Sequence, residues 1–174
     1  MTNTTPNPAP SPASNAPASS APTPGAPASS APTPGAPAPG APAPTIWPGL
    51  QAEDAPALID FLVGTVGFLR TAVHEDGGRV VHAQLDWPEG GGVMLGSHDP
   101  ATEGTCGTPG TASAYVVTDR VEDLYRRLTE AGVRVIAEIE DKPYGGREFA
   151  VADPEGNHWS FGSYRGEPRP GPTP

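Results

Sequence analysis

Hydrophobic and polar positions follow the same order twice in the chain after Thr45. Each time, a short alternating run predicts a strand, a run with apolar residues three and four positions apart predicts a helix, and further alternating runs predict three strands. A single β-α-β-β-β unit cannot cover its own sheet, whereas two such units can do so and form a cleft between them. The pattern therefore predicts an α+β fold built from two similar modules.

The first module begins with a strand that leads into a short helix. Asp54 is a candidate N-cap, and Pro56 lies in the first helical turn, as is typical of a helix start. The helix should end near the glycines at positions 64 and 67. Its strands are predicted at 47–53, 70–74, 79–87 and 92–96, its hairpin turn at 75–78, and its buried helical face at Leu58, Phe61, Leu62 and Thr65.

The second module follows a linker at residues 98–111 that is rich in Gly, Thr and Pro. Asp119 is a candidate N-cap with Glu122 three positions later, as in a capping box, and Gly132 stands where a helix commonly ends. Residues 153–156 are interpreted as residues that form a turn and have no further role. The strands are predicted at 113–117, 133–139, 146–152 and 157–164, and the buried helical stripe at Val121, Leu124, Tyr125 and Leu128.

The chain before Ile46 has a different composition. Residues 1–45 contain no Asp, Glu, Lys, Arg or His, and the decapeptide APASSAPTPG occurs at 16–25 and again at 26–35. Such a segment has nothing to bury, so it should be disordered and partly polyproline-like. It has no basic or apolar region of a secretory signal. We interpret it as a solvated spacer, with a docking tail or tether as the alternative. Residues 166–174 predict a flexible C-terminal tail.

All 20 acidic and all 10 basic residues follow residue 45, so the folded part carries the net charge of −10. This charge argues against nucleic acid and an anionic membrane as partners, because phosphate groups attract Lys and Arg. It is compatible with a cationic ligand, and equally with a protein that is merely soluble. No apolar run approaches the ~20 residues that a membrane span needs. Cys106 is the only cysteine, which excludes an internal disulfide and favours the cytoplasm.

Three groups of residues carry a family likeness. They are DAPALIDFLVGTVGF at 54–68, the strand sequences VVHAQL at 80–85 and GGVMLGS at 91–97, and YGGREFAVADPEGNHWSFGSY at 144–164. In this order and spacing they resemble the vicinal oxygen chelate superfamily, which includes glyoxalase I, extradiol dioxygenases, fosfomycin-modifying enzymes and bleomycin-resistance proteins. The resemblance covers residues 46–165. It implies two βαβββ modules, at about 46–97 and 112–164, whose curved mixed sheet surrounds a cleft, and it implies a homodimer.

Catalytic members of that family hold a divalent metal with His, Glu or Gln side chains from the first and last strands of each module. Counted from the shared motifs, the corresponding positions in this sequence are Trp47, Met94, Ser113 and Ser160. An indole, a thioether and two hydroxyls are not the donors that hard or borderline cations prefer. We therefore expect neither a metal at these positions nor another cofactor.

The alternation of side chains along the strands agrees with this count. If Met94, Ser113 and Ser160 face the cleft, their neighbours must face the helices. Those neighbours are all apolar: Val93, Leu95, Ala114, Trp159 and Phe161. Tyr115 lies two residues after Ser113, so it shares the cleft face.

The departure from the metal pattern favours a binding protein over an enzyme. The chain is most similar to bleomycin-resistance proteins, which implies metal-independent sequestration of a bulky, partly aromatic small molecule, and a cationic one would suit the acidic surface. No catalytic residue is predicted. The expected ligand-binding residues are Trp47, Met94, Ser113, Tyr115 and Ser160.

Two other functions remain open. One is a glyoxalase-type lyase or isomerase with a displaced metal site, for which His82, Glu148 and His158 are the candidate ligands. The other is an interaction module in which the N-terminal tail is the active part. The sequence also leaves open whether the two modules pair within one chain or exchange between two chains.

Overall fold

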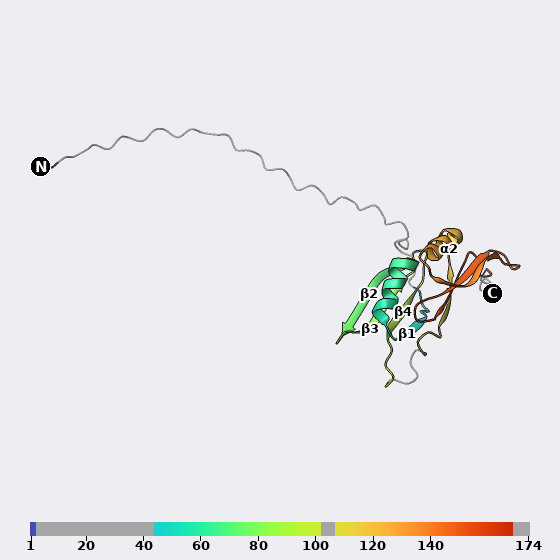
Figure 1. The fold of residues 1–174 in the computed structure, drawn as a ribbon, viewed down its shortest axis with the longest axis horizontal. Helices are drawn as coiled ribbons and strands as arrows, with labels where there is room; N and C mark the ends of the chain where they lie inside the picture. The colour runs from blue at the N-terminus through green and yellow to red at the C-terminus, as the bar shows by residue number, and fades with distance from the viewer. Residues whose placement is uncertain (3–43, 102–106, 169–174) are drawn as a thin grey trace, which may run out of the picture. The chain divides into compact units, whose positions relative to one another are not determined.

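The structure, a computed structural model, describes residues 1–2, 44–101 and 107–168. It contains two four-stranded mixed sheets, each accompanied by one helical segment (Figure 1). The α+β fold and the repeated β-α-β-β-β order are therefore confirmed. The elements are β1 (Gly49–Ala52), α1 (Ala55–Phe61), η1 (Leu62–Val66), β2 (Leu69–Asp76), β3 (Arg79–Asp86), β4 (Gly92–Ser97), β5 (Ser113–Val117), α2 (Val121–Glu130), β6 (Arg134–Asp141), β7 (Arg147–Ala152) and β8 (His158–Gly162).

Several expectations fall outside the described residues. They concern the tail at 3–43, Cys106, and the last residues at 169–174. Within the described part of the chain, no helix has the length and apolar character needed to cross a bilayer.

The two sheets have the same topology and the same register. Their strand orders are β1-β4-β3-β2 and β5-β8-β7-β6, with the first pair parallel and the other pairs antiparallel. Gly49 pairs with Met94 in the first sheet, and Tyr115 pairs with Ser160 in the second. Met94 and Ser160 therefore occupy equivalent positions in the two modules.

The first helix forms for the reasons that the sequence indicated. The Asp54 carboxylate accepts a hydrogen bond from the Ala57 backbone N–H at 3.1 Å, and a proline occupies the first turn. The helix continues into η1, a wider π-helical turn that ends at Gly67, where φ is +99°. Leu58, Ile59, Leu62 and Val66 are buried against the sheet.

The start of the second helix differs from the sequence interpretation, and the capping box predicted there is wrong. The N-cap is Arg120, and no side chain caps it. The Asp119 carboxylate accepts instead from Arg165 at 2.7 Å. Glu89 accepts from the Asp119 backbone N–H at 2.9 Å and from the Thr118 hydroxyl at 2.6 Å.

Glu155 makes the equivalent contacts at the start of the first helix. One carboxylate oxygen accepts from the Asp54 backbone N–H at 2.7 Å, and the other accepts from the Glu53 backbone N–H at 3.1 Å. Interpreting residues 153–156 as turn chemistry alone was therefore wrong. Each module uses one glutamate, Glu89 or Glu155, to bind the strand–helix junction of the other module. We call this pair the clasp glutamates.

Aromatic side chains join the two modules in one hydrophobic core. Phe68 of the first module contacts Trp159 of the second, with ring centroids 5.7 Å apart, and Trp87 contacts Phe161 at 6.1 Å. The Trp87 indole also donates to the Val117 carbonyl at 2.9 Å. On the second sheet, core residues alternate with Ser113, Tyr115 and Ser160, which are exposed or partly exposed, so this face of the sheet is left open.

Candidate functional site

The open face of the second sheet is set by strand alternation. On β8, Trp159 and Phe161 are 1% and 0% exposed, whereas Ser160 between them is partly exposed. Tyr115 lies directly beside Ser160 on the neighbouring strand. The predicted division into a helix-packed face and an open face therefore agrees with the burial pattern.

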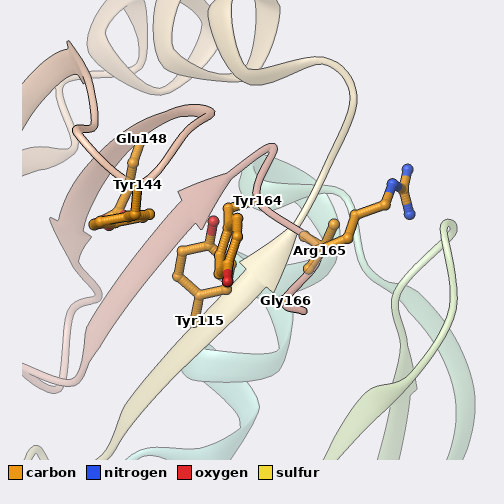
Figure 2. A pocket seen from close by; sticks show the side chains of 7 residues that line it. Tyr115, Tyr144, Glu148, Tyr164, Arg165 and Gly166 are labelled. Carbon is orange, nitrogen blue, oxygen red and sulfur yellow. The ribbon is translucent and has the colours of Figure 1, made fainter. Parts of the chain in front are cut away.

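A cavity of about 610 Å³ lies on this open face, and we call it the tyrosine pocket (Figure 2). Its walls come from β5, from the turn between β6 and β7, from β7, and from the segment after β8. Most of the wall is apolar. The lining residues are Tyr115, Val117, Tyr144, Glu148, Tyr164, Arg165 and Gly166.

Tyr115 lies across β8 because residue 162 is a glycine. A Cβ atom at Gly162 would stand 2.3 Å from the Tyr115 hydroxyl, which is closer than real Cβ atoms come, and 3.0 Å from its Cζ atom. Burial raises the pKa of Tyr115, while a hydrogen bond to the backbone of Tyr164 opposes that shift and the charge of Glu148 adds to it. The hydroxyl therefore keeps its proton at neutral pH.

The other two tyrosines pack on each other. The ring centroids of Tyr144 and Tyr164 are 5.3 Å apart, and the rings meet edge to face at an interplanar angle of 65°. The Tyr144 hydroxyl donates to Glu148 and the Tyr164 hydroxyl donates to Glu167, both at 2.9 Å. These hydrogen bonds to carboxylates raise the pKa of both tyrosines. Since all three hydroxyls have partners, the pocket offers a ligand mainly the faces of neutral rings.

The charges at the pocket are paired. Lys142 Nζ lies 3.8 Å from Oε1 of Glu148, whose Oε2 accepts from Tyr144, and Arg165 forms a 2.7 Å ion pair with Asp119. Figure 2 shows the Arg165 side chain extending away from the three tyrosines. The pocket therefore combines aromatic surface with little net charge.

A comparison with protein families identifies the fold's relatives. The model of the Glyoxalase/Bleomycin resistance protein/Dioxygenase superfamily matches residues 46–161, which is more than half of the chain. The chain belongs to this superfamily. The finding agrees with the resemblance seen in the sequence motifs.

Relatives of known sequence and structure agree with the family. The uncharacterized protein Rv0887c of Mycobacterium tuberculosis is 35% identical over 127 residues, which cover 66% of this chain and 71% of that protein. TioX from Micromonospora sp. ML1 is 31% identical, with a TM-score of 0.57, over 66% of this chain and 93% of TioX. TnmS3, an antibiotic binding protein from Streptomyces sp. CB03234, is 27% identical, with a TM-score of 0.51, over 68% of this chain and 95% of TnmS3.

The sequence motifs predict that four positions correspond to the metal ligands of superfamily enzymes: Trp47, Met94, Ser113 and Ser160. The strand register makes Met94 of the first sheet equivalent to Ser160 of the second. Their partners on the neighbouring strands are Gly49 and Tyr115. Trp47 and Ser113 lie two residues before those partners. Indole, thioether and hydroxyl groups do not match the donors that a divalent ion requires. These four side chains therefore do not fit a divalent metal ion.

The displaced metal site considered from the sequence is not assembled either. His82 pairs with His74 on the first sheet, where their rings stack with centroids 6.2 Å apart. Glu148 pairs with Gly162 and His158 pairs with Ala152, so these two lie at opposite ends of the β7–β8 pair. Within residues 44–101 and 107–168, no three His, Cys, Asp or Glu side chains are placed to hold a metal together.

The five predicted ligand-binding residues fall into two groups. Ser113, Tyr115 and Ser160 share the open face of the second sheet, and Tyr115 is the one that lines the tyrosine pocket. Met94 lies on the first sheet. Trp47 precedes β1 rather than belonging to it, so the strand predicted at 47–53 is too long.

Trp47 has a local packing role. Its indole donates to the Pro44 carbonyl at 3.2 Å, and its ring lies where a side chain on Gly92 would be, with a Cβ atom at that glycine only 2.7 Å away. The ring therefore covers the end of β4.

Sequence reasoning missed two of the pocket's tyrosines and the glycine beneath Tyr115. Tyr144 lies in a turn and Tyr164 follows β8, so neither belongs to an alternating run whose parity could be used. Gly162 did carry a signal. It shares a face with Ser160, and a glycine within a strand often marks a close approach by another group.

Proposed function

We propose that this protein binds and sequesters a small molecule that stacks on the tyrosine pocket, without a metal and without chemical conversion. One observation carries the proposal: three neutral tyrosine rings and little free charge surround about 610 Å³. That volume is typical of sites for drug-sized ligands, which are mostly apolar with a few polar groups. The similarity to TnmS3, an antibiotic binding protein, supports the same class of function.

The ligand that suits these walls is planar and partly aromatic. Tyrosine faces attract flat rings through stacking and CH–π contacts, and both charges at the pocket already have partners. The net charge of −10 would help capture a cation from a distance, so a positive group is proposed for the outer part of the ligand and not for the stacked part.

The remaining lining residues extend this proposal. Ser113 and Ser160 continue the open face beyond Tyr115 and would supply hydroxyl groups to a bulky ligand. Trp47 and Met94 belong to the first module. In a homodimer, these two residues of one chain could lie at the tyrosine pocket of the other chain. The cytoplasm is the proposed location, because the single cysteine suits a reducing compartment.

The test is isothermal titration of the full chain with bleomycin-class glycopeptides and with polycyclic aromatic compounds, each in neutral and ammonium-bearing forms. For a compound that binds, Tyr144→Ala should weaken affinity about tenfold or more, a loss of ~1.4 kcal/mol. Tyr144 is 56% exposed, so its removal should leave the fold intact.

Leu69→Ala is the matched control, since Leu69 is an exposed apolar residue of the first sheet outside the pocket. Trp47→Ala tests whether the lining reaches the first module, and a loss of affinity with an unchanged fold is expected. If no compound binds, or if the affinity is unchanged by Tyr144→Ala, the proposed site is wrong.

A further inference from the structure

Two histidines stand side by side on the first sheet. Ala83 and Leu85 of β3 are 0% exposed, so His82 and Gln84, which alternate with them, lie on the opposite face of the sheet. His74 of β2 is directly opposite His82 in the strand register. Their ring centroids are 6.2 Å apart, and the ring planes differ by only 20°. His74 is exposed and His82 is partly exposed, so solutes can reach both rings.

The ring nitrogens of this pair are not used within the fold. In the part of the chain that the structure describes, the two imidazoles contact each other, and neither has a hydrogen-bond or ion-pair partner. A neutral imidazole has one nitrogen with a lone pair, and histidine is the commonest metal ligand in proteins. The pair is therefore available to bind a metal ion from solution.

The separation of the two rings suits one shared ion. A metal–nitrogen bond of about 2.0–2.1 Å places the ion about 3.2 Å from the centre of an imidazole ring. Two imidazoles on one ion then have centroids about 4.5 Å apart when the bonds are at right angles, and about 6.4 Å apart when they are opposite. The observed 6.2 Å lies within this range. Side-chain rotation can therefore bring both rings onto one ion without moving the strands.

Met94 supplies a third donor on the same face. It is directly opposite Gln84, which shares a face with His82, so Met94 and His82 are diagonal neighbours on β4 and β3. Diagonal neighbours are ~7–8 Å apart, a distance that long side chains can bridge. The methionine side chain is unbranched and has three rotatable bonds, so its sulfur can turn toward the histidine pair.

This set of donors selects the metal. A thioether is a soft ligand that favours Cu(I), and imidazole suits copper as well as zinc. Among the described residues, no third His, Cys, Asp or Glu joins the pair to complete the four-donor site that zinc prefers. Two imidazoles and a thioether carry no negative charge, which suits a monovalent ion. Met94 is thus a poor ligand for the divalent ions of superfamily enzymes and a good one for Cu(I).

We propose that His74, His82 and Met94 bind one Cu(I) ion on the first sheet. The net charge of −10 attracts a cation to this surface. None of the three residues lines the tyrosine pocket, so the copper site does not depend on the proposed small-molecule ligand.

Competition with a coloured Cu(I) chelator, under reducing and oxygen-free conditions, tests the site in the full chain. Cys106→Ser is the background, because a thiol is itself a soft ligand for Cu(I). We expect one Cu(I) per chain. His74→Asn and His82→Asn should each weaken binding at least about tenfold, since even residues that only support a metal ligand contribute that much.

His158→Asn is the matched control, because His158 is an exposed histidine of the second sheet. It should leave Cu(I) affinity unchanged. Urea denaturation checks that each variant folds, and His74 is exposed, so its replacement keeps the test valid if His82→Asn does not fold. No Cu(I) binding, or equal affinity in His74→Asn and His158→Asn, would overturn the proposal.

Methionine methyl signals test the thioether separately. The chain has two methionines, so ¹³C-methyl labelling gives two signals, and Met94→Leu assigns them. One equivalent of Cu(I) should move the Met94 signal and leave that of Met1 in place. Met94→Leu should also weaken Cu(I) binding while leaving any Zn²⁺ binding unchanged, because zinc gains little from a thioether. A Met94 signal that stays in place with copper bound would mean that the Cu(I) site is wrongly assigned.

Discussion

Gly162 controls the position of Tyr115. The two residues touch because β8 carries no side chain at this point, and the Arg147 carbonyl stands only 3.1 Å from where a Cβ atom would be. Backbone cannot move aside as a flexible side chain can. The shape of the tyrosine pocket therefore depends on a residue that contributes no side chain to it.

We expect Gly162→Ala to destabilise the protein by about 1–3 kcal/mol, because an added methyl group in a packed strand forces its neighbours apart. The same change should displace the Tyr115 ring and weaken ligand binding. Urea denaturation measures the first effect. Gly64→Ala is the control, since nothing lies within 4 Å of a Cβ atom there and alanine favours helical backbone. Equal stability of the two variants would contradict the packing argument.

At the residue scale, the sequence predicted what alternation along strands can show. Tyr115 and Ser160 could be assigned to one face because both lie in strands with a period of two. Tyr144 and Tyr164 could not, because their positions depend on how a turn and a strand exit fold back over the sheet. Glu148 was considered as a metal ligand, whereas its carboxylate accepts from Tyr144.

At the element scale, the clasp glutamates bind the junctions at which the two helices begin. Glu89 and Glu155 accept backbone N–H groups at the strand–helix junctions of the opposite modules. Free N–H groups at a helix start need partners, and ionised acceptors make the stronger hydrogen bonds. Each clasp glutamate therefore stabilises a helix start and the contact between modules together.

We expect Glu89→Ala and Glu155→Ala each to lower the free energy of unfolding by about 1–3 kcal/mol, because each leaves backbone donors without their acceptor. Urea denaturation measures both. The two sites lie on different turns and share no partner, so the double variant should lose the sum of the two effects. Glu75→Ala on the exposed end of β2 is the control and should change little. If a clasp variant is as stable as this control, the glutamate that it replaces does not stabilise the strand–helix junction.

The same contacts explain which part of the element pattern was predictable. The periodicity of apolar residues predicted the order of helices and strands, because this periodicity depends only on residues that are close together in the sequence. The capping box at Asp119 failed because the group that satisfies this junction comes from Glu89, 30 positions earlier. A local motif cannot reveal a partner supplied by another module.

At the scale of the whole molecule, one chain buries the helix-packed faces of its sheets and leaves apolar side chains exposed elsewhere. Val81 is 66% exposed, Tyr115 43% and Ile136 40%. Exposed apolar side chains of this kind are candidates for a contact with a partner or a ligand where they form a continuous patch. The homodimer implied by the superfamily would cover part of this surface, and it remains a prediction.

We expect sedimentation equilibrium of the full chain to give twice the single-chain mass of 17.8 kDa at tens of micromolar protein. Val81→Glu should shift the mass toward one chain, because burying an unpaired carboxylate at an interface is unfavourable. Ala57→Glu, which adds the same charge on the exposed side of α1, should leave the dimer intact. A single-chain mass at every concentration would contradict the predicted homodimer. It would also remove the route by which a second copy could bring Trp47 and Met94 to the tyrosine pocket, so the ligand would have to be held by one chain alone.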